Sequence, residues 1–130
     1  MKYSRQRELI YQTVLHNPIH PSADTVHALV RTQEPNISLG TVYRNLNLLA
    51  DQGKLLRIRV PNGSDRFDGW TEGHTHILCT HCGQVFDIPF QDLPGLEKQI
   101  HGIPDFTVTG YQLLVEGVCG NCMDNQDKKA

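Results

Sequence analysis

The sequence lacks long apolar runs. None of its 130 residues belong to a stretch approaching the roughly 20 apolar residues that cross a bilayer. The opening stretch MKYSRQREL is charged and has no apolar signal core, so secretion is not indicated. Only 38% of the residues are apolar, which is lean for a large core. These absences favour a cytoplasmic protein with no membrane partner, built as one ordinary domain or two very small ones.

Enzyme motifs and positive charge in the second half are also scarce. The sequence has no glycine-rich phosphate loop and no nucleophile elbow, so an enzyme is not expected. Residues 69–130 hold three Lys and Arg against eight Asp and Glu, a balance of −5. Residues 1–68 hold nine against six, a balance of +3. This asymmetry predicts two functional units, of which only the first suits a polyanion.

The four cysteines fall into two pairs with the spacing Cys-x-x-Cys. The pairs are Cys79 with Cys82 and Cys119 with Cys122. In a reducing compartment this pattern indicates a metal site before a disulfide. Two such turns brought together give four thiolates in a tetrahedron, which suits zinc and leaves no open coordination position. A redox dithiol is the alternative, but one pair would suffice for that chemistry. We therefore predict a structural Zn²⁺ site.

The first 68 residues follow the pattern of three helices and a hairpin. Helices are predicted over 4–17, 20–33 and 36–53, the first two capped by Ser4 and Ser22. The stretch LLRIRV then alternates apolar and basic residues before a tight-turn signal, Asn-Gly. This order is typical of a winged helix-turn-helix, in which the third helix enters the DNA major groove. A helical bundle with solvated polar faces is the alternative.

Candidate DNA contacts lie on the third helix and on the hairpin. Hydrogen-bonding and methyl contacts to base edges are predicted for Thr41, Tyr43, Arg44 and Asn45. Phosphate contacts are predicted for Lys54, Arg57, Arg59 and Arg66.

Histidine and aspartate residues form a second group of candidate ligands. His74 and His76 lie two apart, so both would project from the same side of a strand. Asp68 lies just before them, Asp87 follows them, and His20 is remote in the sequence. Three imidazoles and two carboxylates suit ferrous iron, manganese or zinc. These residues alone leave open whether they form one site, because a lone histidine is usually structural or solvent-exposed.

Together these motifs resemble the ferric uptake regulator (Fur) superfamily across residues 4–122. The matching stretches are HPSADTV, ISLGTVYRNLNLL, RFD, HTHILCTHCGQVFD and GVCGNC. The sequence is most similar to the peroxide-responsive repressor (PerR) branch. The resemblance implies a regulatory Fe²⁺ or Mn²⁺ bound by His20, Asp68, His74, His76 and Asp87. The iron-sensing branch usually has Glu at the position of Asp87 and His-x-Asp at positions 74–76.

The same resemblance implies an α+β fold with two domains. Residues 1–68 would form a winged helix-turn-helix DNA-binding domain. Residues 69–130 would form an α/β dimerisation domain with the four-cysteine zinc site, containing strands QVFDI and FTVTGYQLLVEG and the helix DLPGLEKQI. A homodimer would bind double-stranded palindromic operator DNA. Many relatives carry a further helix ahead of the first one. Several have His at the position of Tyr111, so the additional metal site of those relatives is not expected here.

The implied function is a metal-dependent repressor that senses hydrogen peroxide. Iron bound at the regulatory site would catalyse oxidation of His20 or His74 and so weaken metal binding. One alternative is an iron or zinc uptake regulator that senses metal occupancy alone. A small metalloenzyme that activates water with the same ligands is a second. A structural zinc-ribbon adaptor, with one metal per chain, is a third.

Overall fold

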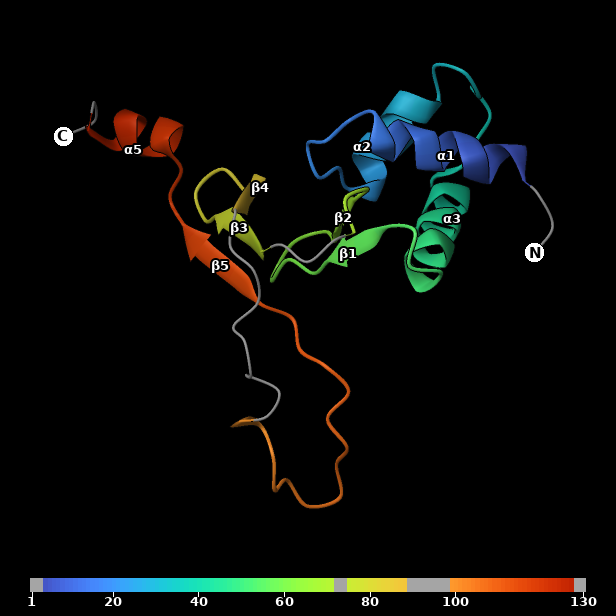
Figure 1. Ribbon diagram of the computed structural model, residues 1–130. Helices are drawn as coiled ribbons and strands as arrows, with labels where there is room; N and C mark the ends of the chain where they lie inside the picture. Colours follow the sequence, from blue (N-terminus) through green and yellow to red (C-terminus); the bar gives the residue numbers. More distant parts are fainter. Residues whose placement is uncertain (1–3, 72–74, 89–98, 128–130) are drawn as a thin grey trace. The chain divides into compact units, whose positions relative to one another are not determined.

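The computed structural model describes residues 4–71, 75–88 and 99–127 (Figure 1). The chain separates into two compact units, Met1–Glu72 and Gly73–Ala130. The domain boundary predicted from the sequence lies after residue 68, and the first compact unit of the structure ends at Glu72.

Three helices supply most of the buried core of the first unit (Figure 1). They are α1 (Arg5–Leu15), α2 (Ala23–Val30) and α3 (Leu39–Asp51). A serine side chain accepts a hydrogen bond from a backbone N–H of the first turn in each helix, at Ser4, Ser22 and Ser38. Such caps satisfy N–H groups that have no partner within the helix. The three predicted helices and the caps at Ser4 and Ser22 are therefore confirmed.

A short hairpin completes the first unit. Strands β1 (Leu56–Ile58) and β2 (Arg66–Asp68) pair antiparallel, with Leu56 opposite Asp68. Phe67 of β2 is 1% exposed and joins the helical core. The other buried members of this core are Ile10, Val14, Ala23, Val26, Val30, Ile37, Val42, Leu46, Leu49 and Leu55. Three helices and a hairpin that shares their core form the predicted winged helix-turn-helix.

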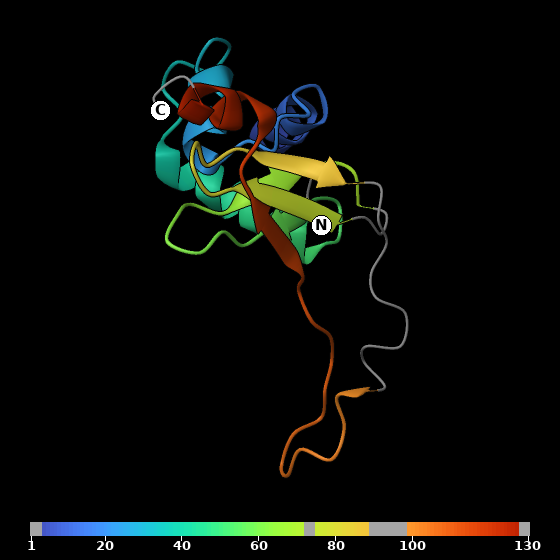
Figure 2. The same cartoon turned by 90° about the vertical axis from the view of Figure 1, so that its left-hand side faces the viewer.

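A three-stranded sheet organises the second unit. Its strands are β3 (Thr75–Cys79), β4 (Val85–Ile88) and β5 (Leu114–Gly117), followed by helix α5 (Gly120–Asp127). The strand order is β4-β3-β5, with β4 antiparallel and β5 parallel to β3 (Figure 2). None of the helices in the described ranges has the length and apolar content needed to cross a membrane.

The strand predicted over 106–117 forms only in its last part. Strand β5 pairs with β3 from the position where Leu114 lies opposite His76. Residues 106–113 run past the end of this pairing, and no strand in the described ranges lies beside them (Figure 1). Residues 106–113 therefore lie outside the three-stranded sheet formed by the described residues. The helix predicted over 92–100 lies largely outside the described residues.

Candidate metal centres

The pairing of β3 with β5 brings the two Cys-x-x-Cys motifs together. Cys79 ends β3 and lies opposite Gly117, two residues before Cys119. The turn after β3 closes with a hydrogen bond from the Gly83 N–H to the Cys79 carbonyl, at 2.9 Å. Gly83 has φ 78°, a left-handed conformation that glycine adopts without steric strain. The sheet register and this turn therefore place both cysteine pairs at the same end of the sheet.

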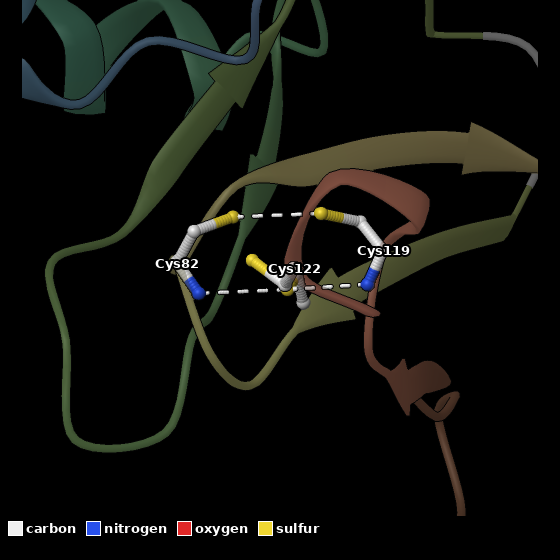
Figure 3. Close-up of side chains that lie close together, drawn as sticks. Cys82, Cys119 and Cys122 are labelled. Atoms are coloured by element: carbon white, nitrogen blue, oxygen red, sulfur yellow. Dashed lines mark hydrogen bonds between the residues drawn. The ribbon is translucent and has the colours of Figure 1, made fainter. Parts of the chain in front are cut away.

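The four sulfur atoms have the spacing of a tetrahedral zinc site. The Sγ atoms of Cys79 and Cys122 are 3.8 Å apart, and those of Cys82 and Cys119 are 3.9 Å apart. All four lie within 4.8 Å of one another. Figure 3 shows Cys82 and Cys119 facing each other, with Cys122 between them. A tetrahedron with Zn–S bonds of about 2.3 Å has edges of about 3.8 Å. The cysteine cluster therefore fits a closed site for zinc.

Backbone groups favour ionisation of one thiol in this cluster. The N–H groups of Cys82 and Cys119 donate to the Cys79 sulfur at 3.5 and 3.4 Å. These two hydrogen bonds lower the pKa of Cys79 to about 5. The hydrogen bond with Cys119, together with burial, raises the pKa of Cys122 to about 12. Four thiolates at this spacing need a cation, so metal binding would release protons from the cluster.

Within the first unit, the structure pairs His20 with Asp68. Nε2 of His20 lies 3.3 Å from Oδ2 of Asp68, and both residues are buried. His20 belongs to the loop before α2, and Asp68 ends strand β2. The other carboxylate oxygen of Asp68, Oδ1, accepts a hydrogen bond from the Trp70 N–H at 2.9 Å. One side of this carboxylate is therefore held by the backbone, and the other faces the imidazole.

Within the second unit, the structure pairs His76 with Asp87. The two residues lie directly opposite each other in the antiparallel pairing of β3 and β4. Residues opposite each other project from the same face of a sheet. Nε2 of His76 lies 3.2 Å from Oδ1 of Asp87. His76 is buried, while the Asp87 side chain is 39% exposed.

Both His–Asp pairs have a spacing that metal ligands adopt. Two ligand atoms with bonds of about 2.1 Å lie about 3.0 to 3.4 Å apart when they are neighbours around one ion. The measured 3.3 and 3.2 Å fall in this range, and the same distances suit a hydrogen-bonded pair. Four of the five predicted regulatory ligands thus occur as two pairs, one in each unit. The fifth, His74, lies outside the described residues.

The residues predicted to contact bases lie on α3. Tyr43 and Arg44 are exposed, and Thr41 and Asn45 are half-buried. Nη2 of Arg44 donates to the Thr41 hydroxyl at 3.3 Å, and Nδ2 of Asn45 donates to the Thr41 carbonyl at 2.9 Å. This network fixes side chains along one face of α3 near its N-terminal end.

Two of the arginines predicted to contact phosphate bind the protein itself. Nη2 of Arg57 donates to Oδ1 of Asn47 at 3.0 Å and lies 3.6 Å from Oδ1 of Asp51, so it links β1 to α3. Nη1 of Arg66 donates to the His20 carbonyl at 2.9 Å. Arg59 is exposed. No pattern in the sequence signalled the contacts of Arg57 and Arg66, because each contact joins two different elements, across 10 positions for Asn47 with Arg57 and 46 positions for His20 with Arg66.

Comparison with known proteins identifies the family. The ferric uptake regulator family matches residues 1–116, nearly the whole chain. The chain belongs to the ferric uptake regulator family. The Staphylococcus aureus peroxide-responsive repressor PerR is 32% identical over 124 residues, covering 95% of this chain and 84% of that protein.

Solved structures of this family share the fold. The Campylobacter jejuni peroxide stress regulator is 31% identical with a TM-score of 0.70, covering 90% of this chain and 88% of that one. The Francisella tularensis ferric uptake regulator, solved with iron, is 26% identical with a TM-score of 0.73, covering 95% of both chains. This chain is thus a metal-responsive regulator of the Fur family. These relatives are regulators, so they give the metalloenzyme alternative no support.

We expect Cys122→Ala to remove zinc while His81→Ala keeps it. Cys122 supplies one of the four clustered sulfurs, whereas His81 is exposed and lies outside the cluster. Zinc would be measured by mass spectrometry of metals after dialysis against a mild chelator. The wild type and His81→Ala should retain about one zinc per chain, and Cys122→Ala well under one. Full zinc retention by Cys122→Ala would contradict the four-sulfur site.

Proposed function

We propose that this chain is a transcriptional repressor that senses hydrogen peroxide through a regulatory metal site. The site would bind Fe²⁺ or Mn²⁺ through His20, Asp68, His74, His76 and Asp87. The cysteine cluster would bind structural Zn²⁺. A homodimer with both metals would bind palindromic operator DNA, and oxidation of His20 or His74 would cause the protein to release the DNA.

The observation that carries this proposal is the presence of one His–Asp pair in each unit. The first unit supplies His20 and Asp68 at 3.3 Å, and the second supplies His76 and Asp87 at 3.2 Å. Two pairs with this nitrogen and oxygen chemistry suit one ion of the Fe²⁺ or Mn²⁺ class. An ion bound to both pairs would hold the two units in a single arrangement.

Such an ion would act by shifting a conformational equilibrium. A ligand favours one arrangement of the units only to the extent that it binds that arrangement more tightly. An ion that needs ligands from both units meets this condition, because separated units offer only two or three ligands each. Loss of one imidazole ligand would weaken metal binding to the arrangement that joins both units. The two DNA-binding units of the dimer would then no longer be held at the spacing of the two operator halves.

The peroxide chemistry requires iron and an imidazole beside it. A ferrous ion supplies the redox chemistry that activates hydrogen peroxide. In the overall step, one peroxide inserts an oxygen atom into an imidazole C–H bond and leaves as water. The imidazole loses two electrons and the peroxide gains two. Mn²⁺ in the same site would hold the ligands without this reaction, so iron-loaded and manganese-loaded protein should respond differently.

Two features of the sequence support peroxide sensing over simple metal sensing. Asp87 and His76 occupy positions where the iron-sensing branch usually has Glu and Asp. The similar Staphylococcus aureus and Campylobacter jejuni proteins are both named as peroxide regulators. The alternative, an iron uptake regulator, draws support from the likeness to the Francisella tularensis protein solved with iron.

The second unit has an apolar segment suited to a second copy of the chain. Phe106 is 76% exposed, and Ile103 and Val108 are exposed beside it. Residues 106–113 lie next to these side chains and outside the three-stranded sheet of the described residues. Packing against a second copy across a two-fold axis would cover these apolar side chains. The resulting dimer would present two α3 helices to the two halves of a palindrome.

We expect peroxide to release DNA only from the iron-loaded protein. Zinc-loaded dimer would receive Fe²⁺ or Mn²⁺ without oxygen and would bind an operator selected from random duplexes. After a low dose of peroxide, gel shift would measure DNA binding and peptide mass spectrometry would locate added oxygen. The iron form should lose DNA and gain one oxygen on the peptide with His20 or His74, because only iron activates peroxide at the site.

The manganese form is the matched control and should keep both its DNA and its peptide masses. If both forms hold DNA after peroxide and only a chelator releases it, the chain is a metal-uptake regulator.

We expect Arg59→Ala, and not Arg57→Ala, to reduce the salt dependence of operator binding. Each phosphate contact contributes about 0.9 to the slope of log K against log salt, so two copies of Arg59 would contribute about 1.8. Arg57 binds Asn47 and lies near Asp51 of α3, so it should position the hairpin instead of neutralising phosphate. Fluorescence anisotropy at several salt concentrations would measure both slopes. Equal loss of slope in the two variants would count against this assignment.

A further inference from the structure

His20 has an unusual backbone conformation. Its φ is 54°, in the left-handed region that residues other than glycine rarely adopt. The next residue is Pro21, and a residue before proline normally favours extended backbone. Such a conformation persists only where the surrounding structure holds it, and it occurs often at functional sites. The contacts of the His20 segment should therefore include the groups that maintain it.

Strand β2 supplies those contacts. The guanidinium of Arg66 donates to the His20 carbonyl at 2.9 Å. The N–H of Phe67 donates to the Pro21 carbonyl at 3.0 Å, and Ser22 forms an antiparallel bridge with Arg66. Both main-chain and side-chain hydrogen bonds thus hold the segment from His20 to Ser22 against β2. Of these bonds, only the one from Arg66 reaches the carbonyl of His20 itself.

The same strand also carries the partner of the His20 imidazole. Asp68 lies two residues after Arg66, so both side chains leave the same face of β2. Arg66 fixes the His20 backbone while Asp68 lies 3.3 Å from its ring nitrogen. The Trp70 N–H holds the second oxygen of Asp68 at 2.9 Å. The His20–Asp68 pair is therefore held at the backbone of one residue and at the carboxylate of the other.

We propose that Arg66 is a positioning residue of the regulatory metal site. This inference rests on the proposed function, which assigns His20 and Asp68 as ligands. Arg66 holds His20 in its left-handed conformation before the ion arrives, so the ion does not have to order the loop. Groups that orient metal ligands in this way typically change metal affinity by about 10- to 100-fold when they are removed.

The charge of Arg66 acts in the opposite direction. A guanidinium close to the site repels a divalent cation, so removing the charge alone would tighten metal binding. Removing the hydrogen bond to His20 would weaken it. The sign of the change therefore separates a positioning role from an electrostatic one. A lysine at this position keeps the charge and can still donate to a carbonyl, although without the planar geometry of arginine.

The test measures Mn²⁺ affinity of the full-length, zinc-loaded protein without DNA. The paramagnetic resonance signal of free Mn²⁺ gives the Kd for wild type, Arg66→Ala, Arg66→Lys and the matched control Arg59→Ala. Arg66→Ala should raise the Kd about 10- to 100-fold, and Arg66→Lys should recover part of this loss. Arg59→Ala, which removes the same charge from an exposed position, should stay within about twofold. Zinc content and circular dichroism would verify folding.

A double variant shows whether Arg66 acts through His20. In a His20→Ala background, replacing Arg66 should change the Kd little, because the residue that Arg66 positions is gone. An unchanged or lower Kd in folded Arg66→Ala would overturn the inference, as would an equal loss in the double variant. If wild type and His20→Ala bind Mn²⁺ alike, the ligand assignment itself fails. That outcome defeats the proposed function whatever Arg66 does.

Discussion

The pairing of β3 with β5 is the constraint on which the second unit depends. It places Cys79 opposite Gly117, and from there the two cysteine turns converge on one group of sulfurs. The same strand carries His76, three residues before Cys79, opposite Asp87 of β4. A structural zinc ion at the cysteines would therefore also fix the strand that presents the second unit's His–Asp pair. The zinc site and the regulatory site would therefore share strand β3 but differ in their ligands. Sulfur ligands would hold the structural zinc ion, and nitrogen and oxygen ligands would hold the exchangeable regulatory ion.

Strand β2 has the corresponding role in the first unit. Its Phe67 belongs to the helical core, while Arg66 and Asp68 on either side reach His20. Burial of one residue thus fixes the positions of the two that hold the ligand. The hairpin also contacts α3 through Arg57 and Asn47. The wing therefore joins a candidate metal ligand to the helix proposed to read DNA, all within one compact unit.

Local sequence patterns predicted the features that depend on interactions between residues close together in the chain. The three helices, the caps at Ser4 and Ser22 and the convergence of the cysteines all follow from residue type and spacing, and the structure confirms them, although each helix is shorter than its predicted range. Contacts between distant segments could not be predicted this way. The bond from Arg66 to His20 spans 46 positions and leaves no local trace, so the sequence suggested phosphate for Arg66. The strand expected over 106–117 pairs with β3 only from Leu114, because a local propensity for extended structure does not specify which strand lies alongside.

A regulatory ion that binds the His–Asp pairs of both units must hold those units in one arrangement. Small-angle scattering of the zinc-loaded dimer, with and without Mn²⁺, would detect this change, with Asp87→Ala as the matched control. Mn²⁺ should make the wild-type protein more compact and should change Asp87→Ala little, since that variant lacks one ligand of the second pair. Identical scattering curves for wild type with and without bound Mn²⁺ would contradict the binding of one ion to both pairs.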